Sequence, residues 1–130
     1  LKKKLPSFHV PTTDERRYLY KLLGIDYKKY SRSVDGILLH VDEVSKVKSN
    51  KDVTLVEIKT TKAKNATNLP YGAFFGITKN EEDLFKTMEN YRLCIVHSTT
   101  EDHAMITFKE YEALIQNKRI QYQVNFKTKE

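Results

Sequence analysis

The chain has a single cysteine, only four glycines and no long apolar run, and each scarcity excludes a class of protein. Cys94 cannot form an internal disulfide, so a reduced intracellular setting, cytoplasmic or nuclear, fits best, with the thiol buried as a small apolar group. The sparse glycines form no phosphate-binding loop. No apolar stretch approaches the roughly 20 residues that a helix needs to cross a bilayer, so no membrane partner is expected.

Length and composition predict one compact domain. The 130 residues are 39% hydrophobic and 31% charged, which is typical of a globular chain too short to divide into two domains. Residues 1–130 are therefore interpreted as one unit. The first residue is Leu1 rather than methionine, and no apolar stretch of the signal-peptide kind follows it, so we expect a fragment of a longer protein.

The charge balance is moderately basic. A net charge of +6 favours a polyanionic partner, because a basic surface attracts nucleic acid and gains from counterion release. Charge alone does not identify that partner, since many basic proteins bind no nucleic acid. The four histidines do not have the spacing of zinc ligands, so no zinc site is expected. The functional argument must therefore come from a specific site.

Two capping boxes mark the starts of two helices. The first is Thr12 with Glu15, and apolar residues at helical spacing follow it. The second is Thr78 with Glu81, which predicts a helix that ends near Asn90. Each box predicts a helix start because the two side chains satisfy backbone N–H groups that the helix cannot pair itself.

The remaining periodicity predicts strands around these helices. Two runs rich in β-branched residues, 34–41 and 53–59, lie on either side of a polar stretch and predict a hairpin. Residues 61–72 lack periodicity and are interpreted as a loop. Further patterns predict strands over 91–97, 104–108 and 120–126 and a short helix over 109–117. This order predicts an α/β protein with a central mixed β-sheet flanked by helices.

Charged residues interrupt the apolar run 53–59. Glu57 and Lys59 are two residues apart and therefore share one face of the predicted strand. The strand is apolar on both faces, which is typical of a central strand, and an unpaired charge there costs free energy. Asp35, near the start of the neighbouring strand, can be brought beside Glu57 by the hairpin. Two converging carboxylates suit Mg²⁺, and an adjacent lysine can orient a water for phosphodiester hydrolysis.

These residues carry a resemblance to a known family. An acid at Asp35, followed by Glu57, Ile58 and Lys59 on the next strand, resembles the motif of the PD-(D/E)xK, or restriction-endonuclease-like, nuclease superfamily. The order of helices and strands is similar as well. Segments 56–61, 74–81 and 90–96 resemble the NO VEIN C-terminal type of domain within it. The resemblance covers Asp35 to about Val96, and Val34 stands where the motif has proline.

The resemblance implies a restriction-endonuclease-like fold with an α-β-β-α-β core and a Mg²⁺-dependent endonuclease that leaves 5′-phosphates. Asp35 and Glu57 would hold Mg²⁺, or Mn²⁺ in its place, and the carbonyl of Ile58 would add a ligand. Lys59 would position the attacking water. DNA is the implied substrate, and a homodimer or further domains of a longer chain stay open as partners. Glu15 resembles an acid that some members carry on the first helix, although its capping role explains it more simply.

Each of these residues also has a simpler interpretation. Glu57 and Lys59 can form an ordinary ion pair, and Asp35 with Gly36 is a frequent turn pair. A non-catalytic nucleic-acid-binding or interaction domain with the same fold therefore stays open, as does a scaffold domain whose basic charge is incidental.

Other polar and aromatic residues remain secondary candidates. The residues Lys62, Lys64 and Asn65 fit a solvated loop as well as a phosphate contact. Tyr91 and Arg92 are second choices for contacting phosphate, and His97 is a weaker candidate for assisting the chemistry. Four aromatic residues are expected in the core rather than as stacking platforms for bases: Tyr18, Tyr20, Phe74 and Phe75.

Overall fold

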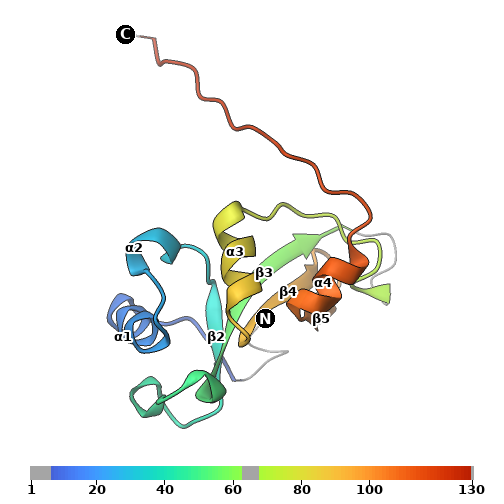
Figure 1. The fold of residues 1–130 in the computed structure, drawn as a ribbon. Helices are drawn as coiled ribbons and strands as arrows, with labels where there is room; N and C mark the ends of the chain where they lie inside the picture. Colours follow the sequence, from blue (N-terminus) through green and yellow to red (C-terminus); the bar gives the residue numbers. More distant parts are fainter. Residues whose placement is uncertain (1–6, 63–67, 130) are drawn as a thin grey trace.

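A five-stranded mixed sheet lies at the centre of the computed structural model, which describes residues 7–62 and 68–129 (Figure 1). Its order follows the chain: β1 (Phe8–His9), β2 (Gly36–Leu39), β3 (Val53–Thr61), β4 (Tyr91–His97) and β5 (His103–Ile106). β3 and β4 pair in parallel, and the other neighbours pair antiparallel. The predicted hairpin is confirmed, with Ile37 opposite Leu55.

Four α-helices accompany the sheet: α1 (Thr13–Leu23), α2 (Tyr27–Tyr30), α3 (Lys79–Thr87) and α4 (Phe108–Leu114). Two short 3-10 turns, η1 (Val44–Lys46) and η2 (Asn50–Asp52), lie in the connection between β2 and β3. A parallel strand pair needs a crossover connection, and α3 occupies the crossover between β3 and β4 (Figure 1). The predicted α/β class with a mixed sheet and flanking helices is thus confirmed.

Both predicted capping boxes are present. The Thr12 side chain accepts the Glu15 N–H, the Glu15 side chain accepts the Thr12 N–H, and α1 ends at Gly24 in the left-handed conformation that glycine adopts without strain. The same reciprocal pair, Thr78 and Glu81, begins α3. The helix starts were therefore readable from the sequence.

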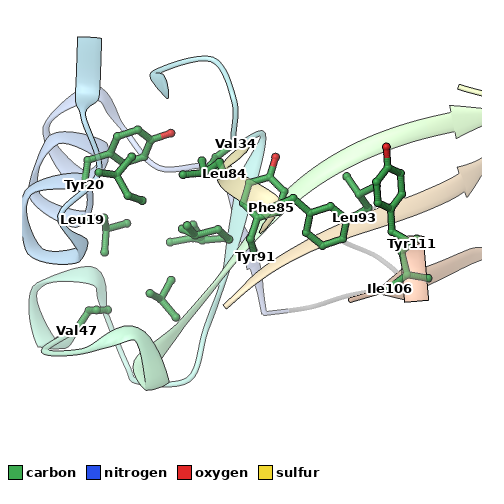
Figure 2. Close-up of a cluster of buried hydrophobic side chains, with 14 of the residues drawn as sticks. Leu19, Tyr20, Val34, Val47, Leu84, Phe85, Tyr91, Leu93, Ile106 and Tyr111 are labelled. Atoms are coloured by element: carbon green, nitrogen blue, oxygen red, sulfur yellow. The ribbon is translucent and has the colours of Figure 1, made fainter. Parts of the chain in front are cut away.

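The main hydrophobic core lies between the helices and one face of the sheet (Figure 2). All four helices contribute buried or partly buried apolar side chains to it. From the strands come residues of one parity, including Leu55 and Leu93, and from α3 comes Phe85, whose ring packs against Tyr91 at 5.4 Å between centroids. This is the face on which Glu57 and Lys59 also lie, because they share the parity of Leu55.

The other face of the sheet carries a smaller cluster made of strand residues only. Phe8, Val56 and Cys94 are buried there, and partly buried neighbours surround them. The Phe8 ring lies over Gly36, where an added Cβ would come within 2.3 Å of the ring. The expected burial of the single thiol is confirmed, and burial raises the pKa of Cys94 to about 11.

Two expectations about the elements are wrong in detail. The strand expected over 104–108 ends at Ile106, because Thr107 begins α4 with a capping box of its own. Residues 120–126 were expected to form a strand, yet within the described chain they are extended, highly exposed and unpaired, because an alternating pattern favours an extended backbone without supplying a partner. The short elements β1 and α2 were not predicted.

No helix among the described residues has the length and apolar character to cross a membrane.

Candidate active site

The three residues singled out by the motif gather where the first turn of α3 faces β3. Glu57 and Lys59 project from the middle of β3 toward the helix-covered face. Asp35 precedes the first residue of β2, and its backbone N–H donates to the Val56 carbonyl at 2.9 Å. The hairpin therefore brings Asp35 beside Glu57, as its position in the sequence predicted.

Asp35 is exposed, and its carboxylate is tied to the backbone of β3. Its Oδ2 accepts the N–H of Ile58 at 2.7 Å. Its negative charge adds to the effects of burial and of Glu81 that raise the pKa of Glu57. Ile58 thus contributes a donor that orients Asp35, and the proposed metal-ligand role of its carbonyl stays a prediction.

The segment leading to Asp35 is held from two further elements. Arg16 on α1 donates to the Val34 carbonyl at 2.6 Å, and the Tyr91 hydroxyl on β4 donates to the Ser33 carbonyl at 2.5 Å. Tyr91 is fully buried, so its role is in packing and anchoring and not in contacting a phosphate from solvent.

Lys59 lies between two carboxylates. Its Nζ is 2.8 Å from Oε1 of Glu81 and 3.3 Å from Oε2 of Glu57. Glu81 was expected only to cap α3, and it does so: the same Oε1 accepts the Thr78 N–H at 2.9 Å. No signal in the sequence indicated its second role, because the capping box already explained Glu81.

Burial and these contacts shift the pKa values of Glu57 and Glu81 in opposite directions. Burial, a hydrogen bond with Glu81 and the nearby charges of Asp35 and Glu81 raise the pKa of Glu57 to about 9. Burial alone would raise the pKa of Glu81 too, but its hydrogen bonds with Glu57, Lys59 and the Thr78 N–H outweigh that and lower it. The single ammonium of Lys59 can neutralise only one of the two glutamates. Glu81 has the shorter contact with Lys59 and also accepts the Thr78 N–H, so we assign the negative charge to Glu81.

The pKa of Lys59 is raised in this setting. Burial would lower it, but the hydrogen bond and charge of Glu81, together with the hydrogen bond to Glu57, outweigh that effect. Lys59 is therefore a fixed cation at neutral pH. Because Glu57 is protonated in this arrangement, its contact with Lys59 is a hydrogen bond from the ammonium to a neutral carboxyl group.

One carboxyl oxygen of Glu57 lacks a hydrogen-bond partner among the described residues. Oε1 is buried and has no donor within hydrogen-bonding distance among the described residues, and a proton shared with Glu81 or a cation would satisfy it. Within residues 7–62 and 68–129, no three side chains of the His, Cys, Asp or Glu type form a group that could hold a metal ion. The set inferred from the motif has two such side chains, Asp35 and Glu57, with oxygen ligands that fit a hard cation.

The secondary candidates fall outside this centre. Glu15 binds His9 and Thr12 and serves as the cap of α1. Arg92 donates to the carbonyls of Glu89 and Tyr91. Lys62 is exposed next to the end of β3, whereas Lys64 and Asn65 lie outside the described residues.

The aromatic residues behave less uniformly than expected. Tyr20 is buried and Phe75 packs against the core, which confirms the prediction for both. Tyr18 was wrongly expected in the core: it is 38% exposed, and its hydroxyl donates to the Val47 carbonyl. Phe74 was wrongly expected in the core: its side chain is 88% exposed, and its backbone N–H donates to the Thr61 hydroxyl.

Comparisons with known proteins add no relative to this picture. No protein-family model, no curated protein and no solved structure matches the chain. The functional interpretation therefore depends on the geometry around Lys59.

Proposed function

We propose that this domain is a Mg²⁺-dependent endonuclease of the PD-(D/E)xK type that hydrolyses phosphodiester bonds in DNA. The observation that carries the proposal is the meeting of Asp35, which directly precedes β2, with Glu57 and Lys59 of β3, beside the first turn of α3. The fold class and the parallel strand pair after the hairpin agree with a restriction-endonuclease-like core. Basic net charge agrees with a nucleic-acid substrate.

Each residue has a distinct task in this proposal. Asp35 and ionised Glu57, with the Ile58 carbonyl, would hold the cation. A bound Mg²⁺ would polarise the scissile phosphate and lower the pKa of a water. Lys59, held as a cation by Glu81, would orient that water and offset the negative charge that grows in the transition state. Glu81 is then a positioning residue, because it acts through Lys59.

The test uses Asp35→Asn, which removes the charge and keeps an oxygen that can accept the Ile58 N–H. We expect plasmid cleavage with Mg²⁺ or Mn²⁺ to fall at least about 100-fold, while the free energy of unfolding changes by less than about 0.5 kcal/mol. Asp14→Asn, an exposed acid on α1, is the matched control and should cleave normally. Full cleavage by Asp35→Asn would end the proposal.

The closed arrangement of the acids favours a second candidate, a non-catalytic nucleic-acid-binding or interaction domain with the same fold. Glu57 is only 4% exposed, and Lys59 is already bridged to Glu81, which is what a structural ion-pair cluster would require. Calorimetric titration with Mn²⁺ separates the two candidates. Binding that Asp35→Asn abolishes supports the nuclease, and the absence of binding to the unaltered protein supports the second candidate.

A further inference from the structure

The C-terminal segment carries an apolar pattern that the fold does not use. Ile120, Tyr122, Val124 and Phe126 alternate with polar residues and are 72–91% exposed. Such alternation gives an extended segment one apolar side and one polar side. Within the described chain this segment pairs with no strand, and Figure 1 shows it running away from the sheet. An exposed apolar strip of this kind indicates a missing partner.

The start of the segment is tied to α3 by an ion pair. The Lys118 ammonium lies 2.7 Å from the Glu82 carboxylate on α3, and the same carboxylate accepts the Tyr111 hydroxyl. Ile120 follows two residues later. β5 is the edge strand beyond β4, and along the chain α4 lies between β5 and this segment.

In the part of the chain that the structure describes, β5 has an unpaired edge, and apolar side chains on one face of the sheet lie next to it. Among the described residues no strand pairs with its outer side, so its outer backbone groups are free to accept another strand. Met105 on β5 and Val96 on β4 are partly buried members of the smaller cluster on the second face. A strand added here would place apolar side chains next to them. The other edge, β1, has only two residues.

We propose that residues 120–126 form an exchanged strand that pairs with the β5 edge of a second copy of this chain. Each copy has both the donor segment and the receiving edge, so the exchange is reciprocal and closes into a twofold dimer. The apolar side chains of the incoming strand then cover the border formed by Val96 and Met105. This dimer does not depend on the proposed reaction.

Sedimentation analysis of the whole chain over a range of concentrations tests the proposal. We expect a monomer–dimer equilibrium that Ile120→Ser/Val124→Ser weakens at least about 100-fold, the effect of removing two buried aliphatic side chains. Gln121→Ser/Gln123→Ser changes the polar side of the same segment and serves as the matched control. It should leave the equilibrium nearly unchanged.

Hydrogen exchange supplies the second measurement. Amides of residues 103–106 and 120–126 should be protected at concentrations that favour the dimer and should lose that protection together on dilution. A monomer at every concentration overturns the proposal. So does a dimer that survives Ile120→Ser/Val124→Ser, or a monomer whose segment stays protected, because the strand would then pair within its own chain.

Discussion

Lys59 Nζ and Glu81 Oε1 lie 2.8 Å apart, although a long connection separates their elements along the chain. The same Glu81 oxygen accepts the Thr78 N–H. The cap of α3 and the partner of the lysine are therefore one atom. A change at the start of this helix must reach Lys59 through that atom.

Replacing Thr78 with alanine removes the hydroxyl that accepts the Glu81 N–H, and so weakens the hold of the capping box on Glu81. Losing the cap costs about 1 kcal/mol of unfolding free energy. Thr107→Ala removes the equivalent cap from α4, which contributes no side chain to the site, and should cost a similar amount. Only Thr78→Ala should also lower cleavage, because it loosens Glu81 and with it Lys59. Equal cleavage by the two variants would contradict the link between cap and lysine.

Removing the lysine should destabilise the fold as well as the reaction. In Lys59→Met the buried Glu81 charge loses its cation, and we expect a loss of about 1.5–3 kcal/mol in urea denaturation. Adding Glu81→Gln should recover part of it, because the uncompensated charge is then gone. Lys118→Met breaks an exposed pair with Glu82 and should cost less than about 1 kcal/mol. Additive effects of the two site mutations would rule out this coupling.

Stability should fall as the pH rises through the neutral range. The pKa of Glu57 is raised in the folded protein to about 9, above its ordinary value of 4.5. Its contribution is thus fully present below about pH 4.5 and is lost toward pH 9, with a slope of at most about 1.4 kcal/mol per pH unit. Glu81, whose pKa is lowered, acts in the opposite sense only below pH 4.5.

Urea denaturation at several values between pH 5 and pH 9 measures this slope. Glu57→Gln keeps a neutral side chain of similar shape, so the slope should largely disappear and the variant should exceed the unaltered protein in stability near pH 8. Glu89→Gln, an exposed change, should keep the slope. An unchanged slope in Glu57→Gln would assign the pH dependence to another group.

Metal binding at the proposed centre should release a proton. Glu57 must ionise to act as a ligand, so the apparent affinity for Mg²⁺ should rise between pH 6 and pH 9. Calorimetry in two buffers with different ionisation enthalpies reports the number of protons released. Asp35→Asn should abolish the binding heat in both buffers. Binding without proton release would place the cation elsewhere.

A methyl group at position 36 should disturb the second face of the sheet. In Gly36→Ala the new Cβ would lie 2.3 Å from the Phe8 ring and 3.1 Å from the His9 carbonyl, so the ring must move off its site. We expect a loss of about 1–3 kcal/mol in unfolding free energy. Phe8→Leu should reduce that loss when combined with Gly36→Ala. A loss unaffected by Phe8→Leu would point to the backbone contact instead.

Local chemistry made much of the fold predictable. The capping boxes of α1 and α3 and the apolar parity of β3 each depend on a few neighbouring residues, which is why they could be read directly. Phe74 illustrates the limit: its ring is exposed, because the burial of an apolar side chain depends on tertiary contacts that its neighbours in the sequence do not specify. The strand expected over 120–126 failed for a related reason: alternation describes one strand, but pairing needs a second.

The proximity of three residues of the candidate site could be predicted from the sequence, whereas the contact between Glu81 and Lys59 could not. Asp35, Glu57 and Lys59 were placed together from parity and hairpin logic. Glu81 was missed because its capping role already explained it. Its contact with Lys59 depends on how the crossover positions α3 over β3, which no local pattern encodes.

The peptide that leads into Asp35 has consequences for any ligand. The Ser33 carbonyl accepts a hydrogen bond from Tyr91, and the Val34 carbonyl accepts one from Arg16. The Asp35 carboxylate itself accepts the Ile58 N–H. Three separate parts of the molecule thus immobilise this acid in advance. A ligand that binds there would find the Asp35 carboxylate already ordered, so the free-energy cost of ordering this segment on binding would be small.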